Sequence, residues 1–479
     1  MAAVTIKNLT FSYSTEHTSL PATLKNLNLT FPSGKFSLLI GPSGTGKSTL
    51  LKLLANLYPA FRGRLETGTI LYDDQSLADM QPSSISRMVA LMFQDPDQQF
   101  AMDTVENEII FALENLQVAP EQISAAVEWA LEFVDITNLR HRVLSTLSGG
   151  EKQKVALAII VAMDSDVILL DEPFASIDRG SRQFLLNRLA KLRDDAGKTI
   201  ILADHNLSGY QDLVDAVFEL DPAAKQITRL SDEQAENRFA NFDHQLSPVK
   251  LGIPTAEENQ VLHLSQLTLA TPRETLVHVD SLGFAKGKIT LLTGENGSGK
   301  STLFNAITRL GHYQGQITYL ADDIQKIRLK RYAMQVGLMF QDAQSQFLGI
   351  TVDEELAISK KASHHPDYYT DSKITEMLTT INLSGCGDQV VYSLSEGQKK
   401  KLQLLEMLIV GSPVLLLDEP LKGLDLKSVT EVATFIATAS HELGQTFIII
   451  SHQLTGLAAI VDYHLTLANQ TLTYEEELK

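Results

Sequence analysis

Gly41-Pro-Ser-Gly-Thr-Gly-Lys47-Ser48 recurs, with changes, as Gly294-Glu-Asn-Gly-Ser-Gly-Lys300-Ser301. Both stretches fit the pattern G-x-x-x-x-G-K-[ST], and each follows an apolar run, 36–40 or 289–293, that is typical of a buried strand. Glycines in such a loop let backbone N–H groups close around phosphates, and the next helix adds the positive end of its dipole. The chain is therefore expected to bind two nucleotides. A glycine-rich turn without a ligand is the alternative for either stretch taken alone.

Further landmarks recur in the same order in both halves. Lys300 lies 253 residues after Lys47, whereas the later pairs share an offset of 247: Gln94 with Gln341, Ser148 with Ser395, Asp171 with Asp418, Asp178 with Asp425, and His205 with His452. A repeat of this period indicates a duplicated domain and not a solenoid. We expect domains at 1–232 and 260–479, joined by a linker at 233–259 that has no sustained periodicity.

Each half alternates apolar runs with helical patterns. The runs 167–170, 199–204, 414–417 and 446–451 favour strands buried on both faces of a mostly parallel sheet. Helical segments are expected at 121–134 and 371–381, between the glutamine and the later motifs. The predicted fold class is α/β: two P-loop NTPase domains, each with a mostly parallel sheet core and a helical subdomain.

Composition narrows the class of function. The chain has 479 residues, of which 44% are apolar, and a net charge of −18. This charge disfavours nucleic acid as a partner, because phosphate contacts need clustered basic residues. The single cysteine, Cys386, fits a reducing compartment and excludes an internal disulfide. The N-terminus resembles no signal peptide, and no apolar stretch approaches the roughly 20 residues that span a bilayer.

The residue types at the repeated positions suit phosphate chemistry. Lys47 and Lys300 should reach the β- and γ-phosphates, and Ser48 and Ser301 should bind Mg²⁺. Asp171 and Asp418 end apolar strands and suit the magnesium site. The next residues, Glu172 and Glu419, stand where a carboxylate could orient or deprotonate the attacking water. Strand ends solvated by acidic residues are the alternative interpretation.

Two more repeated features add candidate phosphate contacts. Ser148 and Glu151 have the spacing of a helix capping box, and Ser395 and Gln398 repeat it. A capped helix with glycine in its first turn presents N–H groups to an anion, although such a helix can also be purely structural. His205 and His452 each follow an apolar strand and are expected to contact the γ-phosphate.

In this order the motifs resemble the ATP-binding cassette (ABC) family over nearly the whole chain, twice. The resemblance rests on the phosphate loop, the glutamine, Leu147-Ser-Gly-Gly-Glu, Val167-Ile-Leu-Leu-Asp-Glu-Pro, Asp178 and His205. It implies that Gln94 and Gln341 are Q-loop glutamines that complete the magnesium sites, and that Asp178 and Asp425 are D-loop aspartates. It also implies that the two cassettes pair head to tail, so that Lys47 works with Ser395 and Lys300 with Ser148, and that the cofactors are ATP and Mg²⁺.

The candidate residues form three sets. The catalytic set is Glu172, His205, Gln94, Glu419, His452 and Gln341. The nucleotide-binding set is Tyr13, Gly41, Pro42, Ser43, Gly44, Thr45, Gly46, Lys47, Ser48, Thr49, Ser148, Gly149, Gly150, Asp178, Gly294, Glu295, Asn296, Gly297, Ser298, Gly299, Lys300, Ser301, Thr302, Ser395, Gly397 and Asp425. The magnesium set is Ser48, Gln94, Asp171, Ser301, Gln341 and Asp418.

The residues after the first Q-loop glutamine are similar to those of a narrower group. Met92-Phe-Gln-Asp-Pro-Asp-Gln-Gln-Phe100 resembles the ATPases of energy-coupling-factor importers, which take up vitamins and transition metals. The resemblance implies integral membrane partners that present arginines near Asp95, Asp97 and Asp342, and a peripheral place on the cytoplasmic face of the membrane. A solvated acidic loop is the alternative for these carboxylates. Tandem sugar-importer ATPases, ribosome-associated tandem cassettes and regulatory nucleotide-binding proteins are the alternative classes.

Two departures from the family pattern predict unequal sites. Glu396 replaces the first signature glycine in the second cassette, which is expected to weaken closure over the nucleotide of the first. Tyr13 is expected to stack on adenine, whereas 267–271 in the second cassette contains no aromatic residue. Because both lysines, both glutamates and both histidines are retained, both sites are expected to hydrolyse ATP.

Overall fold

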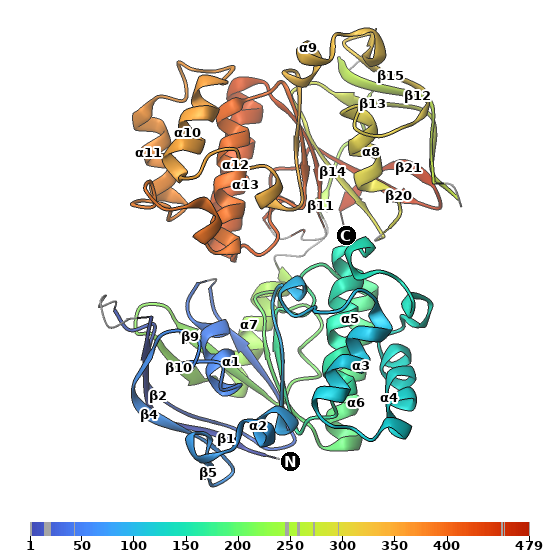
Figure 1. The fold of residues 1–479 in the computed structure, drawn as a ribbon. Coiled ribbons are helices and arrows are strands. Elements are labelled where there is room, and N and C mark those ends of the chain that lie inside the picture. The colour runs from blue at the N-terminus through green and yellow to red at the C-terminus, as the bar shows by residue number, and fades with distance from the viewer. Residues whose placement is uncertain are drawn as a thin grey trace. The chain divides into compact units, whose positions relative to one another are not determined.

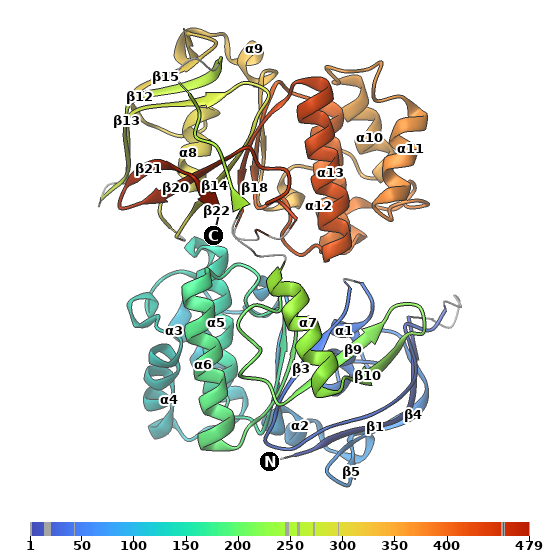
Figure 2. The same cartoon turned by 180° about the vertical axis from the view of Figure 1, so that it is seen from behind.

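A computed structural model describes residues 2–13, 21–42, 44–244, 249–255, 259–271, 274–295, 297–451, 454 and 456–478. The chain divides into two compact units, Met1–His244 and Gln245–Lys479, which are described one at a time. Figures 1 and 2 show the course of the chain within each unit from opposite sides. Among the described residues, no helix combines the length and the apolar character needed to cross a bilayer.

Unit 1 contains two sheets. A six-stranded sheet has the order β10-β9-β3-β8-β7-β6, in which only β10 is antiparallel to its neighbour. Its strands are β3 (Phe36–Ile40), β6 (Val89–Met92), β7 (Val167–Asp171), β8 (Thr199–Ala203), β9 (Ala216–Asp221) and β10 (Gln226–Arg229). An antiparallel sheet contains β1 (Val4–Ser12), β2 (Leu24–Phe31), β4 (Arg64–Tyr72) and β5 (Gln75–Ser76). Strands β3, β7 and β8 are buried at every position, as their continuous apolar runs predict.

The helices of unit 1 divide into two groups. Helices α3 (Val105–Asn115), α4 (Pro120–Phe133) and α5 (Gly149–Ala162) contact one another and form the helical subdomain (Figure 1). The others are α1 (Lys47–Leu54), α2 (Pro82–Met88), α6 (Arg179–Ala196) and α7 (Asp232–His244). The predicted fold class, a mostly parallel sheet with a helical subdomain, is confirmed.

Unit 2 repeats this plan in a single ten-stranded sheet, ordered β16-β15-β12-β13-β21-β20-β14-β19-β18-β17. Its strands are β12 (Gln260–Ala270), β13 (Thr275–Ala285), β14 (Ile289–Gly294), β15 (Gln314–Tyr319), β16 (Asp322–Asp323), β17 (Val336–Met339), β18 (Val414–Asp418), β19 (Thr446–Ile450), β20 (Tyr463–Ala468) and β21 (Thr471–Glu475). Its helices are α8 (Lys300–Ile307), α9 (Leu329–Ala333), α10 (Val352–Lys361), α11 (Asp371–Thr380), α12 (Glu396–Val410) and α13 (Leu426–Leu443).

The stretch expected to be a linker, 233–259, holds two ordered elements. Helix α7 packs on unit 1: Phe239 is buried in its core, and Arg238 donates two hydrogen bonds of 3.0 Å to the carboxylate of Glu219. Ala235 and Phe239, four residues apart, pack into the core, and Phe242 is half-buried. This apolar pattern is short and lies in an otherwise polar segment, so it does not stand out in the sequence. Strand β11 (Val249–Lys250) pairs with β22 (Glu477–Leu478) within unit 2. The residues between the two elements, 245–248, lie outside the described part of the chain.

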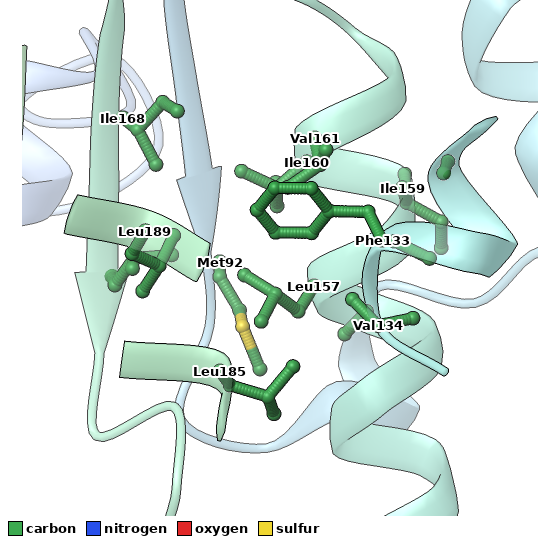
Figure 3. Close-up of a cluster of buried hydrophobic side chains, with 14 of the residues drawn as sticks. Met92, Phe133, Val134, Leu157, Ile159, Ile160, Val161, Ile168, Leu185 and Leu189 are labelled. Carbon is green, nitrogen blue, oxygen red and sulfur yellow. The ribbon is translucent and has the colours of Figure 1, made fainter. Parts of the chain in front are cut away.

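A hydrophobic cluster fixes the helical subdomain of unit 1 to its sheet. Met92 from β6, Phe133 from α4, Leu157 from α5 and Leu189 from α6 point toward one another (Figure 3). Leu157 is fully buried on a helix whose first residues form a motif of the nucleotide site. Packing in this cluster therefore determines the position of that motif.

We predict that Leu157→Ala destabilises unit 1 by about 2–5 kcal/mol, because it removes buried methyl groups and leaves a cavity. Urea denaturation followed by the fluorescence of Trp129, the single tryptophan, reports this unit. Phe61→Ala is the control, because Phe61 is 81% exposed, and its effect should stay within about 0.5 kcal/mol. Equal denaturation midpoints for the two variants would contradict the prediction.

Candidate active sites

The motif residues of unit 1 meet at one edge of its parallel sheet. Strand β8 lies between β3 and β7, so the carboxyl ends of all three strands are neighbours. The phosphate loop follows β3, Asp171 ends β7, and His205 follows β8. Ligands of open α/β sheets bind at this edge. In unit 2 the strands β14, β18 and β19 have the same order.

Both phosphate loops have the tight geometry that their glycines permit. Gly46 and Gly299 precede α1 and α8 with φ angles of 115° and 107°, in the left-handed region. A Cβ atom on Gly46 would come within 2.9 Å of Leu24. The ammonium of Lys47 donates to the carbonyls of Gly41 and Pro42 at 2.7 and 2.9 Å, and Lys300 donates to Gly294 and Glu295 at 2.8 and 2.6 Å. Each lysine is therefore held inside its own loop.

The other loop residues complete the same turns. Thr45 donates its hydroxyl to the Pro42 carbonyl at 2.8 Å, and the Ser298 amide donates to the Glu295 carbonyl at 3.3 Å. Gly44 and Gly297 have positive φ angles of 75° and 79°. Thr49 and Thr302 lie in the first turns of α1 and α8. Ser43 and Asn296 lie outside the described residues.

The serine after each lysine meets the aspartate that ends a neighbouring strand. Ser301 donates its hydroxyl to Asp418 at 2.7 Å, and Ser48 hydrogen-bonds to Asp171 in unit 1. Asp171 is buried, and its Oδ1 atom has no hydrogen-bond partner among the described residues. Burial raises the pKa of Asp171 to about 6, against the effect of the Ser48 bond.

These groups fit the Mg²⁺ ion that ABC-type sites use. A hydroxyl and a carboxylate are hard oxygen ligands of the kind Mg²⁺ prefers, and a carboxylate oxygen without a partner can accept a hydrogen bond from a metal-bound water. Ser48 and Asp171 would hold the ion in unit 1, and Ser301 and Asp418 in unit 2. The ion would neutralise charge on the β- and γ-phosphates.

The candidate base of unit 1, Glu172, is held from two sides. Its backbone φ is +47°, and its buried carboxylate accepts a hydrogen bond from Gln94 Nε2 at 2.9 Å. His205 Nδ1 lies 3.3 Å from the other carboxylate oxygen. The structure therefore brings together the phosphate loop, the strand-end acids, Gln94 and His205. Such a carboxylate can orient water or take a proton from it.

The pKa directions of Glu172 and His205 agree with an ion pair. Burial alone would raise the pKa of Glu172, but His205, Lys47 and the hydrogen bond from Gln94 together outweigh it and hold that pKa below its ordinary value. Burial alone would lower the pKa of His205, but the carboxylates of Glu172 and Asp204 raise it. In unit 2, burial raises the pKa of Glu419 to about 7, and the charge of Asp418 adds to the rise. His452 lies outside the described residues.

The two candidate signature motifs begin helices that are closely alike. Ser148 caps α5 and Ser395 caps α12, and each forms a complete capping box, with Glu151 and Gln398 as the respective partners. Gly149, Gly150 and Gly397 lie in the first turns. The carboxylate of Glu396 is 46% exposed and pairs with Lys399 at 2.8 Å. Its charge is therefore balanced within α12.

The candidate D-loop aspartates are also helix caps. Asp178 accepts a hydrogen bond from the Ser181 amide at 2.9 Å, and Asp425 accepts one from the Ser428 amide at 3.0 Å. Each aspartate lies six residues after the candidate base of its unit. An N-cap role explains their position in the fold without a nucleotide contact.

Tyr13 is part of an aromatic group beside the first phosphate loop. Its hydroxyl hydrogen-bonds to Thr49 Oγ1 at 2.7 Å, and its ring packs edge-on against Phe11 and Tyr58. The Arg62 guanidinium lies 5.2 Å from the ring centroid. The Tyr13 hydroxyl is therefore tied to the first turn of α1, and the contact of its ring with adenine stays a prediction.

This arrangement is that of a nucleoside triphosphatase with two phosphate-loop sites. The sequence profile of the ABC transporter family matches residues 24–175 and 277–422, so both phosphate loops, both Q-loop glutamines, both signatures and both pairs of strand-end acids fall within it. The chain belongs to the ABC transporter family as a tandem ATP-binding protein, and it is an ATPase. The predicted family and activity are confirmed, and the cassettes bind ATP.

Known proteins resemble the chain over nearly its whole length. A protein of Bacillus subtilis (strain 168) named for HMP/thiamine import ATP binding, YkoD, is 31% identical over 98% of this chain and 91% of its own. A Treponema denticola protein named for ABC transporter ATP binding is 29% identical over 98% of this chain and 96% of its own. Among solved structures, ribosome-bound archaeal Pelota and ABCE1 matches with a TM-score of 0.73 and 18% identity, over 98% of this chain and 78% of that one. This last likeness shows a shared fold alone.

Sequence reasoning missed several residues near the second site. Lys400 on α12 donates to the carbonyl of Gln341 at 2.8 Å. Gln341 is exposed, and its place in the second site stays a prediction. Gln403 on α12 also donates a hydrogen bond to Gln346, which follows Gln341 in the same loop. The sequence signal for these residues was the run Lys399-Lys-Lys401. Lysines are normally exposed to solvent, but these three are buried.

We predict that Glu172→Gln lowers the pKa of His205, because it removes the carboxylate that keeps the imidazolium charged inside the protein. NMR titration of the ring protons measures this pKa, and the exposed His141 is the internal control. The pair adds stability that is fully present between about pH 4.5 and 6.5. This stability is lost as the pH rises through the raised pKa of His205, and also as the pH falls through the lowered pKa of Glu172. An unchanged pKa of His205 in the variant would refute the ion pair.

We predict that Tyr13→Ala weakens ATP binding at the first phosphate loop by about 1–3 kcal/mol, the range measured for stacking of one base. Tyr13→Phe retains the ring and loses only the hydrogen bond to Thr49, so it should bind ATP nearly as wild type does. Isothermal titration in a Lys300→Ala background restricts binding to the first loop. Equal affinities of the alanine variant and wild type would leave the ring with a structural role only.

Proposed function

We propose that this chain is the ATP-hydrolysing subunit of a membrane importer of the energy-coupling-factor type, with a vitamin or a transition metal ion as cargo. The observation that carries the proposal is an exposed apolar surface beside the second Q-loop, which suits a membrane protein partner. The name of the Bacillus subtilis relative, HMP/thiamine import, supports the choice of cargo class. The proposal places the chain peripherally on the cytoplasmic face of the membrane.

The apolar surface, here called the Leu348 patch, consists of Leu348, Ile350, Val390 and Tyr392. Leu348 is 80% and Ile350 64% exposed, values that are unusual for large aliphatic side chains. The members lie together, because the Val391 amide donates to the Ile350 carbonyl at 2.9 Å and the Tyr392 ring packs edge-on against Phe347. Leu348 follows the Q-loop glutamine Gln341 after one short turn, Ala343–Ser345.

The carboxylates expected to meet arginines of the partner have bonds within their own units. Asp97 pairs with Lys152 at 2.7 Å, with its own side chain 58% exposed. Asp95 accepts hydrogen bonds from the Asp97 amide and from Gln98, and Asp342 accepts them from the Gln344 amide and from Ser345. In the proposal, an arginine of the partner would share these carboxylates and replace Lys152 at Asp97.

The proposal includes head-to-tail pairing of the two cassettes, so that the ATP on Lys47 is capped by Ser395 and the ATP on Lys300 by Ser148. Support comes from the retained signature geometry: both serines form complete capping boxes that leave first-turn N–H groups to face an anion. Glu396 in the second signature was expected to repel the nucleotide of the first cassette. Its ion pair with Lys399 compensates this negative charge.

We predict that the full chain, affinity-purified from solubilised membranes, brings a small set of integral membrane proteins with it. The double variant Leu348→Glu with Ile350→Glu should lose them, because two charges cannot be buried against an apolar partner. Leu310→Glu is the matched control, because Leu310 is 64% exposed and lies outside the patch. Recovery of ribosomes would contradict the importer proposal, and a companion with a periplasmic-type sugar receptor would favour a sugar importer.

We predict that Glu172→Gln and Glu419→Gln each reduce ATP turnover of the purified complex, and that the double variant abolishes it. The reason is that each glutamate follows the strand end beside its own phosphate loop, Glu172 buried and Glu419 half-buried, and removing a general base costs about 10²–10⁴-fold at that site. Steady-state phosphate release measures turnover. If either single variant turns over as fast as wild type, only one site is active.

A further inference from the structure

Lys400 is a buried lysine that contacts the second Q-loop. It lies in the second turn of α12, the helix that begins at the second signature, and it is only 5% exposed. Its ammonium donates to the backbone carbonyl of Gln341 at 2.8 Å and to that of Phe340 at 3.3 Å. A buried ammonium is strongly unfavourable unless such acceptors surround it. The two Q-loop carbonyls are therefore the reason that the charge can stay there.

A second side chain of the same helix holds the same peptide. Gln403 Nε2 donates to the Phe340 carbonyl at 3.0 Å and to Gln346 Oε1 at 2.8 Å. Gln346 Oε1 in turn accepts from the Phe340 amide at 3.2 Å. Both polar groups of Phe340 are thus fixed, so the chain enters Gln341 in one defined position.

The surroundings of Lys400 are those of the hydrolysis site. Burial lowers its pKa to about 8, and the carboxylates of Asp418 and Glu419 oppose this fall. Those residues are the strand-end acid and the candidate base of unit 2. The ammonium therefore joins the helix that begins at the second signature to the Q-loop of the same unit, close enough to the acidic strand end for its carboxylates to act on the charge.

The equivalent position in unit 1 makes a different connection. Gln153, at the common offset of 247, is buried on α5, and its Oε1 atom accepts a hydrogen bond from the Ser176 amide at 2.7 Å. Ser176 lies in the loop between Glu172 and Asp178. The residue at the position of Ser176 in unit 2 is Gly423, with a φ of 75°. The same position of the signature helix therefore makes different contacts in the two units. Gln153 bonds to the loop after Glu172 in unit 1, and Lys400 bonds to the Q-loop in unit 2.

We propose that Lys400 is a positioning residue for ATP hydrolysis at the second phosphate loop, where it fixes the backbone of the Q-loop so that Gln341 can complete the site. The proposal rests on the ATPase activity of the family and on the assignment of Gln341 as the Q-loop glutamine. It requires neither import nor any particular membrane partner.

The first test compares Lys400→Met with Lys401→Met in the full-length chain. Lys401 is the next residue, is also buried, and donates to the Ile381 carbonyl at 3.0 Å, away from the Q-loop. Both variants carry Glu172→Gln, so that phosphate release reports the second site. We expect Lys400→Met to lower kcat about 10- to 100-fold with little change in KM for ATP, as a misplaced catalytic group does. Lys401→Met should keep kcat within about twofold.

Both variants lose a buried ammonium, so thermal unfolding should shift by similar amounts, and the difference in kcat then isolates positioning from folding. Lys400→Arg retains two-carbonyl donation and should restore most of kcat. Equal losses of kcat in the two methionine variants, or no loss in either, would overturn the proposal.

The second test asks whether Lys400 acts through Gln341. In the same background, Gln341→Ala should lower kcat and raise the Mg²⁺ concentration for half-maximal turnover, and adding Lys400→Met should change neither quantity further. Groups that act as a unit are non-additive in this way. Fully additive losses would overturn the proposal, as would a Gln341→Ala variant with unchanged kcat. Neither result would bear on import, which the membrane purification tests separately.

Discussion

The parallel alignment of the strands β3, β8 and β7 is the constraint on which the first site depends. Parallel strands end at the same edge of the sheet. Lys47 after β3, His205 after β8 and the two acids at the end of β7 therefore become neighbours in space, although they are far apart in sequence. Backbone hydrogen bonding between fully buried strands fixes their spacing. The strands β14, β19 and β18 impose the same order on unit 2, which explains why the motif order survives duplication.

Sequence reasoning succeeds where a local pattern determines a local structure. The continuous apolar runs locate β3, β7 and β8 within a residue, and the capping boxes at Ser148 and Ser395 form as their spacing predicts. It fails where a few contacts in space decide the outcome. Helix α7 depends on Phe239 entering the core of unit 1, and the burial of Lys400 depends on two carbonyls about 60 residues away along the chain. Neither contact leaves a periodic trace in the sequence.

The two copies differ in the interior of the signature helix. Helix α5 is filled with aliphatic residues that pack against β6 and α4, whereas α12 buries Lys400, Lys401, Gln403 and Glu406. Burial raises the pKa of Glu406 to about 9, with the charge of Glu355 adding to the rise, so this carboxyl is neutral at physiological pH. Lys400 and Gln403 donate to backbone carbonyls of the Q-loop, and these bonds favour a defined geometry of the Q-loop in the second cassette.

The short covalent connection between the units has a consequence for assembly. Helix α7 belongs to unit 1 and β11 to unit 2, so only 245–248 separate elements that are anchored in different units. Two unlike cassettes made as separate chains would find each other at a rate set by their cellular concentrations, and each could also pair with a copy of itself. A connection this short makes the local concentration of one cassette around the other independent of expression level. The chain therefore guarantees equal numbers of its two cassettes, and dilution cannot separate them.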